Sequence, residues 1–137
     1  MTNLDKKKFL GKYAGINLEL KRLALERDRL RTYLTRVSEG MSKEKIAAHL
    51  HALDADTDAR IHKLLLTRAA IYDALESVPD ETQRALLRYR YLEQYSPLQT
   101  SFKLFLSQRQ FYRLQNYALR ALVVPENFPF ENETDAE

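Results

Sequence analysis

The chain has 137 residues, is 45% hydrophobic, contains no cysteine and has a formal net charge of +3. This composition supports a folded core and excludes disulfide bonds and cysteine-based zinc sites. Neither an apolar run of about 18–20 residues nor a signal peptide is recognisable, so we expect a cytoplasmic protein that does not enter a membrane.

A heptad pattern of apolar residues predicts one long helix in the first part of the chain. Alternating steps of four and three connect its positions: Phe9, Tyr13, Ile16, Leu20, Leu23, Arg27, Leu30, Leu34 and Val37. Only Arg27 interrupts the stripe. Because Gly11 and Gly15 lower the helix propensity, we expect the first turns to fray.

A second long helix is expected after a short turn over residues 37–42, with Ser42 as its N-cap. Its stripe shifts locally at Thr57. The stripe contains eight aliphatic residues: Ile46, Leu50, Leu53, Ile61, Leu64, Ile71, Leu75 and Val78. Since a short connection forces neighbouring helices to be antiparallel, we predict a coiled-coil-like helical hairpin as a domain over residues 1–78.

Three shorter helices are expected next. The first covers residues 79–94, where a proline and two acidic residues stand at the beginning. Ser96, followed by a proline, predicts the start of a second helix that ends near Phe105. Ser107 is the expected cap of the third, over residues 108–122. The fold class is therefore expected to be all-α.

Residues 125–137 are expected to form an acidic tail that touches the body of the protein through Phe128 and Phe130. Its charged residues are all acidic: Glu126, Glu131, Glu133, Asp135 and Glu137. All 22 basic residues but only 14 of the 19 acidic ones precede this tail, which gives the rest of the chain a net charge of +8. Such a basic body favours a polyanionic partner, for example nucleic acid.

Two patterns that resemble metal sites lack the residues that such sites need. Residues 54–58, Asp-Ala-Asp-Thr-Asp, resemble the start of a calcium loop, but Ala59 replaces its glycine and Leu65 its bidentate acid. The histidines do not share a helix face at ligand spacing: His49, His51 and His62. With no phosphate loop and no nucleophile elbow, we expect no metal, no cofactor and no enzymatic activity.

The last expected helix has two contrasting faces. An apolar stripe consists of Phe111, Leu114, Ala118 and Leu122. The opposite face has no acid and carries side chains that can bond bases or phosphates: Gln108, Arg109, Tyr112, Arg113, Asn116 and Arg120. Arg suits guanine, Gln and Asn suit adenine, and Arg120, further along, would contact the backbone only. This face therefore predicts contacts with double-stranded DNA, the alternative being an ordinary polar helix surface.

Residues 106–122, Leu-Ser-x-Arg-x-Phe-x-Arg-Leu-x-x-x-Ala-Leu-Arg-x-Leu, resemble the recognition helix of sigma factor region 4. The chain as a whole is similar to the ArpU-like and RinA-like late transcription regulators of phages. These have a long charged helical N-terminal part and a C-terminal region-4-like module. The matching residues are Leu86-Leu87, Arg90-Tyr91-Leu92, Ser107, Tyr112-Arg113-Leu114 and Ala118-Leu119.

This resemblance extends over residues 9–122 and is specific over residues 86–122. It implies a three-helix helix-turn-helix domain over residues 79–124, in a phage or prophage regulator that acts in the host cytoplasm.

The helix expected over residues 96–105 departs from this family, which has Trp or a similar anchor and then Ile-Ala there. This chain has Pro97, Thr100 and Ser101 instead. An apolar stripe of its own is formed by Leu98, Phe102 and Phe105. We expect the helix to have rotated so that the two phenylalanines are buried; if exposed, they would form a contact surface for RNA polymerase or a second copy.

Two functions of different classes follow from these observations. The first is a DNA-binding transcription regulator, with the hairpin acting in dimerisation or in contact with polymerase. The second is a helical protein-interaction module that binds or inhibits a host or phage complex, for example an anti-CRISPR-type inhibitor. The acid-free helix face favours the first, whereas the acidic tail and the altered helix favour the second.

Overall fold

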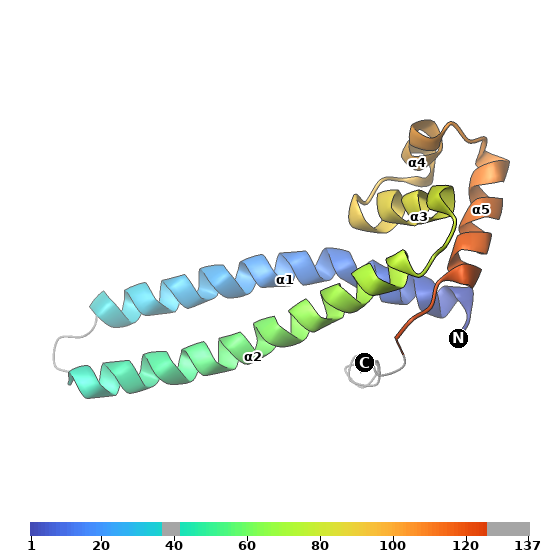
Figure 1. Ribbon diagram of the computed structural model, residues 1–137. Coiled ribbons are helices and arrows are strands. Elements are labelled where there is room, and N and C mark those ends of the chain that lie inside the picture. Colours follow the sequence, from blue (N-terminus) through green and yellow to red (C-terminus); the bar gives the residue numbers. More distant parts are fainter. Residues whose placement is uncertain (37–41, 126–137) are drawn as a thin grey trace. The chain divides into compact units, whose positions relative to one another are not determined.

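The computed structural model describes residues 1–36 and 42–125, and every regular element in this part of the chain is a helix (Figure 1). The two long helices are α1 (Asn3–Arg36) and α2 (Lys43–Glu76). Four short elements follow: α3 (Glu81–Leu87), the π-helical turn η1 (Arg88–Leu92), α4 (Pro97–Leu104) and α5 (Gln108–Ala121). The expected all-α class is confirmed. The expected turn over residues 37–41 and the acidic residues 126–137 lie outside the described residues.

The chain divides into two compact units whose boundaries fall inside α1 and α2. Unit 1 consists of Met1–Ala14 and Thr67–Glu137, and unit 2 consists of Gly15–Leu66. Each long helix therefore contributes to both units. The domain boundary expected between residues 78 and 79 lies inside unit 1.

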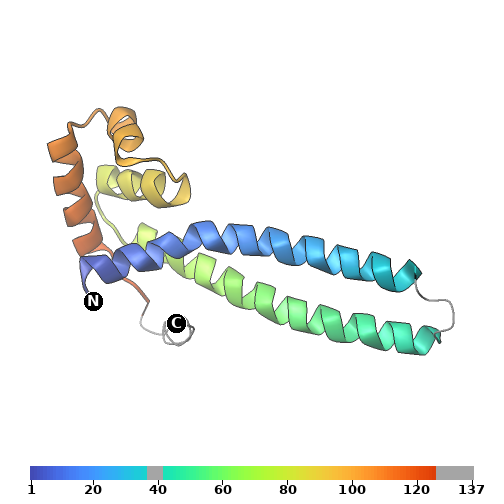
Figure 2. The ribbon, with the colours of Figure 1, turned by 180° about the vertical axis from the view of Figure 1, so that it is seen from behind.

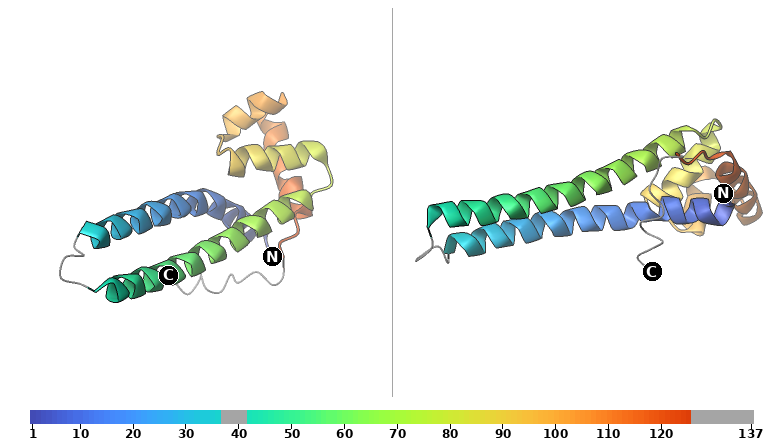
Figure 3. Two further views of the ribbon diagram at one scale, coloured as in Figure 1. Left: turned by 60° about the vertical axis from the view of Figure 1, so that its left-hand side comes forward. Right: turned by 90° about the horizontal axis from the view of Figure 1, so that it is seen from below.

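Ion pairs join the two helices of unit 2, which run side by side (Figure 3). The guanidinium of Arg27 lies 2.8 Å from a carboxylate oxygen of Asp58, and that of Arg31 lies 2.6 Å from Asp54. Arg31, which follows Arg27 in α1, thus pairs with Asp54, which precedes Asp58 in α2. This order is the one that antiparallel helices require. These pairs also explain the one charged residue in the apolar stripe, because the stem of Arg27 can pack while its head reaches Asp58.

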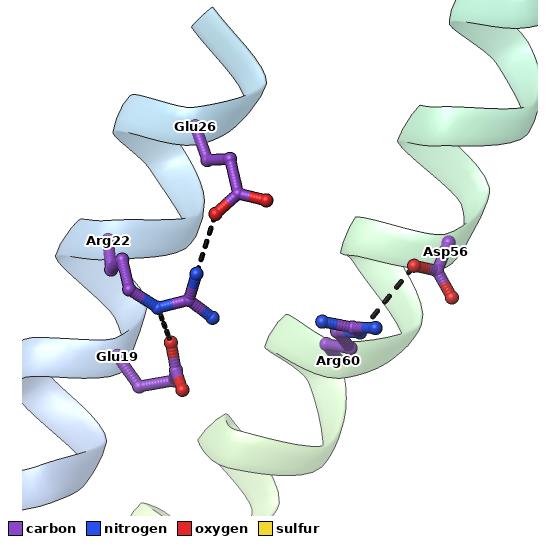
Figure 4. A network of polar contacts seen from close by, with 5 residues as sticks. All are labelled: Glu19, Arg22, Glu26, Asp56 and Arg60. Atoms are coloured by element: carbon purple, nitrogen blue, oxygen red, sulfur yellow. Dashed lines mark hydrogen bonds and ion pairs between the residues drawn. The ribbon is translucent and has the colours of Figure 1, made fainter. Parts of the chain in front are cut away.

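Further ion pairs lie along the outer faces of these helices (Figure 4). Arg22 pairs with Glu19 and with Glu26, the latter at 2.6 Å, and Arg60 lies 3.5 Å from Asp56. Pairs of this spacing stabilise an exposed helix by only a few tenths of a kcal/mol each. The aspartates of the calcium-like run therefore belong to charged helix faces.

The expected apolar stripes are the less exposed faces of α1 and α2. Phe9, Ile16 and Leu23 are buried, and the other described positions of the first stripe are half-buried. Every position of the second stripe is buried or half-buried, including Val78 just after the end of α2. Fraying of the first turns was a wrong expectation, because α1 is helical from Asn3 and both Phe9 and Leu10 are fully buried. Tertiary packing outweighs the roughly 1 kcal/mol by which each glycine lowers helix stability.

The three short helices α3, α4 and α5 pack against one another within unit 1 (Figures 1 and 2). Leu86 and Leu87 of α3 are fully buried. The stripe expected for α5 is also confirmed, since Phe111, Ala118 and Leu122 are buried and Leu114 is half-buried. Leu119 and Gln115 are buried as well, so the inner face of α5 is wider than expected.

Side-chain caps fix the beginnings of these helices. The Oγ atoms of Ser96 and Ser107 each accept a hydrogen bond from the amide three residues later, at 3.1 Å. The side chains of Gln99 and Gln110 accept in return from the cap amides, which completes two capping boxes. Helix α3 begins later than expected, because Asp80 is its cap and Pro79 precedes it.

The connection between η1 and α4 is held by backbone and aromatic contacts. Gln94 has a left-handed backbone with φ of 59°. The amide of Tyr95 donates to the carbonyl of Tyr89 at 2.8 Å, and the two rings stack with centroids 5.5 Å apart. Arg90 also donates to the carbonyl of Tyr95. The chain is thereby fixed just before the cap of α4.

Candidate nucleic-acid interface

Helix α5 brings the six residues predicted to contact DNA onto its exposed face. All of them are exposed: Gln108, Arg109, Tyr112, Arg113, Asn116 and Arg120. Their positions repeat at helical spacing, so they form one surface about four turns long. No acidic residue occurs in α5. The face therefore presents three positive charges and several hydrogen-bonding groups without a competing carboxylate from its own helix.

Buried residues on the opposite side position this face. Phe111 is fully buried, and its ring meets that of Tyr112 edge to face, with centroids 5.0 Å apart. Because Phe111 is held in the core, it limits the orientations of the neighbouring Tyr112 ring. Further along, the guanidinium of Arg120 lies 5.6 Å from the ring centroid of Tyr117. An aromatic ring thus borders the polar face near each of its ends.

The beginning of α5 is suited to an anion. Ser107 caps the amide of Gln110, whereas the amides of the first two residues of a helix have no partner within the helix. Those amides belong to Gln108 and Arg109. The helix dipole and the Arg109 side chain therefore act in the same direction, toward a negatively charged group.

The end of α5 is held by the start of α1, a contact that sequence analysis did not anticipate. The ammonium of Lys6 donates to the carbonyl of Leu119 at 2.8 Å and to that of Arg120 at 3.2 Å. The side-chain amide of Asn3 donates to the carbonyl of Asn116 at 3.4 Å. The last carbonyls of a helix have no partner within it, and a cation there also complements the dipole.

The expectation that Phe102 and Phe105 are buried was wrong. Leu98 is 69% exposed, Phe102 75% and Phe105 93%. The buried residues of α4 are instead Thr100 and Ser101. Their hydroxyls donate to backbone carbonyls four residues earlier, at 2.9 and 2.8 Å, so these small polar side chains enter the core with their hydroxyls satisfied. Thr100 and Ser101 thus face inward, and the phenylalanines face solvent.

The exposed side of α4 forms a mainly apolar groove of about 690 Å³. Its lining extends from the start of α4 to the start of α5: Pro97, Leu98, Ser101, Phe102, Phe105, Leu106 and Gln108. Gln108 also belongs to the polar face of α5. The apolar groove and the candidate DNA-reading face are therefore adjacent.

Phe105 ends α4 in a backbone conformation that usually requires glycine. Its φ and ψ are 56° and 45°, in the left-handed region. The amide of Leu106 donates to the carbonyl of Ser101 at 2.9 Å, and that of Phe105 to the carbonyl of Phe102 at 3.3 Å. This is a Schellman motif, in which a Cβ atom costs about 1 kcal/mol or more. Since the ring is almost fully exposed, burial offsets little of this cost.

No helix in the described part of the chain is both long and apolar enough to cross a membrane. Within residues 1–36 and 42–125, no group of three or more His, Cys, Asp or Glu side chains is arranged to hold a metal ion.

Comparisons with known proteins add no family assignment. No protein-family model matches the chain, and no match was found among curated proteins or solved structures.

Proposed function

We propose that this protein binds double-stranded DNA and regulates the transcription of a phage or prophage. In this proposal α3, α4 and α5 form a helix-turn-helix similar to sigma factor region 4, and α5 lies in the major groove. The observation that carries the proposal is the polar face of α5, which is exposed, basic and free of acidic residues. DNA-binding helices need such a face to approach a polyanion closely.

Each side chain has a role set by its place on α5. Gln108 and Arg109 are at the beginning of the helix, where side chains of a recognition helix reach base edges. Tyr112, Arg113 and Asn116 lie one to two turns later and would contact the following bases. Arg120, near the end, would contact a phosphate. One paired contact between arginine and guanine is worth about 1–3 kcal/mol of discrimination.

The long helices complete the proposed arrangement. An antiparallel hairpin over residues 1–78 would carry the DNA-binding module, residues 79–124, and would act through a second copy or RNA polymerase. The ion pairs of Arg27 and Arg31 support the antiparallel pairing.

A second candidate function is that of a protein-interaction module that binds or inhibits a host or phage complex. The exposure of Leu98, Phe102 and Phe105 favours it, because soluble proteins seldom expose neighbouring large apolar side chains without a partner. If this second candidate is right, Phe102→Ser should abolish binding or inhibition of the partner complex. The original chain should then show no specific DNA binding.

The two candidates are distinguished by selecting bound duplexes from a random DNA pool and titrating the selected duplex at several salt concentrations. We expect Arg109→Ala with Arg113→Ala to weaken binding roughly 100-fold or more. Arg29→Ala with Arg36→Ala removes the same charge from exposed positions of α1 and is the matched control, expected to change affinity only slightly. Circular dichroism establishes that both variants fold. If no duplex is enriched, or if both double variants bind equally well, the DNA-binding proposal is wrong.

A further inference from the structure

The start of α1 lies beside the last turns of α5, and both segments belong to unit 1 (Figures 1 and 2). The side-chain amide of Asn3 donates to the carbonyl of Asn116 at 3.4 Å. The ammonium of Lys6 donates to the carbonyls of Leu119 and Arg120. Because Asn116 and Arg120 both belong to the polar face of α5, the start of α1 borders that face.

The last turns of α5 would lie at the level of the DNA backbone. Helix α5 has 14 residues and is therefore about 21 Å long. The major groove of B-DNA is only about 12 Å wide. A helix that contacts bases with its first turns therefore passes a phosphate strand with its last turns, where Arg120 lies. The charge around Arg120 thus decides how closely this end of α5 can approach DNA.

The carbonyl end of a helix by itself repels a phosphate. Its last carbonyls have no partner within the helix and together carry a charge of roughly −0.5. Lys6 brings a full positive charge to two of these carbonyls, at 2.8 and 3.2 Å. The local charge at the end of α5 is thereby reversed, from roughly −0.5 to roughly +0.5.

A second lysine lies at the edge of the same face of α1. The positions i, i+3, i+4 and i+7 share one face of a helix, and here they are Asn3, Lys6, Lys7 and Leu10. Leu10 is fully buried and Lys7 is half-buried. Lys8 is exposed and lies about 100° further around the helix. Lys7 thus adds a cation on the side of α1 that faces α5, whereas Lys8 does not.

Few acidic side chains compete with these cations. Met1–Ala14 contain four lysines and a single acidic residue, Asp5. The carboxylate of Asp5 accepts hydrogen bonds from the amide and the hydroxyl of Thr2, at 3.1 and 2.9 Å, within the first turn of α1. Since α5 has no acidic residue, the place where the two helices meet is positively charged on both.

We propose that the start of α1 is a second DNA contact, in which Lys7 and Arg120 bind the phosphate strand that α5 passes. Lys6 positions the two helices for this contact and cancels the negative end of α5. The inference rests on the proposed function and adds to its interface an element outside the helix-turn-helix of residues 79–124. A phosphate contact carries no base information, so it strengthens binding to every duplex equally.

Salt-dependent titration of Lys7→Gln tests the contact. The slope of log affinity against log salt concentration should fall by about 0.9, the value of one phosphate contact. Binding at 100 mM salt should weaken about three- to tenfold, equally for the selected duplex and for a duplex of scrambled sequence. Lys7→Arg keeps the charge and should retain the slope. Lys8→Gln removes the same charge from the neighbouring residue and is the matched control, expected to leave the slope nearly unchanged. Equal slopes of Lys7→Gln and Lys8→Gln overturn the inference.

Methylphosphonate substitution, which removes the charge of one phosphate at a time, locates the contact on the DNA. We expect one position at which the substitution weakens binding of the original chain and of Lys8→Gln but not of Lys7→Gln. The lack of such a position also refutes the contact.

The failure of this inference differs from that of the proposed function. If Arg109→Ala with Arg113→Ala abolishes the preference for the selected duplex while Lys7→Gln has no effect, the proposed function stands and the second contact is wrong. If no duplex is enriched, both are wrong.

Discussion

The ammonium group of Lys6 lies 2.8 Å from the carbonyl oxygen of Leu119, so the beginning of α1 caps the end of α5. These residues are 113 positions apart in the chain. Lys6 thus joins the first and the last described helices. Its contribution to stability can be measured directly.

Replacing Lys6 with alanine should lower the free energy of unfolding by about 1–2 kcal/mol, because two carbonyls lose a charged donor and the helix dipole loses its cation. Urea denaturation monitored by circular dichroism measures this change. Lys8→Ala, which removes an exposed lysine from the same helix, is the control and should change stability by less than about 0.5 kcal/mol. Equal effects of the two substitutions would show that the cap contributes nothing.

Replacing Phe105 with glycine should stabilise the protein by about 0.5–1 kcal/mol. Glycine adopts the left-handed backbone at this position without steric cost, and this gain exceeds the entropy that it adds to the unfolded chain. Thermal unfolding measures the change. Phe105→Ala removes the same exposed ring but keeps the Cβ atom, so it should give no such gain. If alanine and glycine stabilise equally, ring exposure rather than backbone strain is responsible.

Gln115→Leu should stabilise the protein by about 1 kcal/mol. The Gln115 side chain is buried, and its Oε1 atom has no hydrogen-bond partner among the described residues. A leucine of similar size removes this unsatisfied oxygen and adds apolar contacts. Urea denaturation gives the difference, with the exposed Asn116→Leu as a control that should have a small effect. A loss of stability in Gln115→Leu would mean that the buried amide is hydrogen-bonded in solution.

Tyr13→Phe should lower the pKa of Tyr72. The two hydroxyls lie 2.8 Å apart, and this hydrogen bond, together with burial, raises the pKa of Tyr72 above its ordinary value of 10.0. The protonated phenol is therefore favoured in the folded state, and its contribution to stability is present below pH 10 and lost as the pH rises through the raised value. Titration of the tyrosine Cζ signals by carbon-13 NMR measures the shift. An identical Tyr72 titration in both proteins would contradict this assignment.

The beginnings of α4 and α5 could be predicted because their causes are local. Ser96 and Ser107 each form a capping box with the glutamine three residues later, and these signals depend on four consecutive residues. The heptad stripes of α1 and α2 were also recognisable, because burial of one helix face leaves a periodic pattern. Arg27 broke that pattern for a reason that needs the second helix, namely its ion pair with Asp58.

The orientation of α4 could not be predicted in this way. Periodicity showed that Leu98, Phe102 and Phe105 share a face, and hydrophobicity favoured burial of that face. The opposite face carries Thr100 and Ser101, whose hydroxyls bond to their own helix and so enter the core. The role of Lys6 was equally hidden, because a lysine with a distant carbonyl partner has the same sequence signature as a solvated one.

The division of unit 1 between residues 1–14 and a stretch that begins at Thr67 has a consequence for biosynthesis. Unit 2 comes from one continuous stretch, so its helices can pair while the rest of the chain is still being translated. Lys6, in contrast, waits for Leu119, which a ribosome adds roughly 5–25 s later at about 5–20 residues per second. The contacts between Lys6 and α5 are thus among the last that a newly made molecule can form.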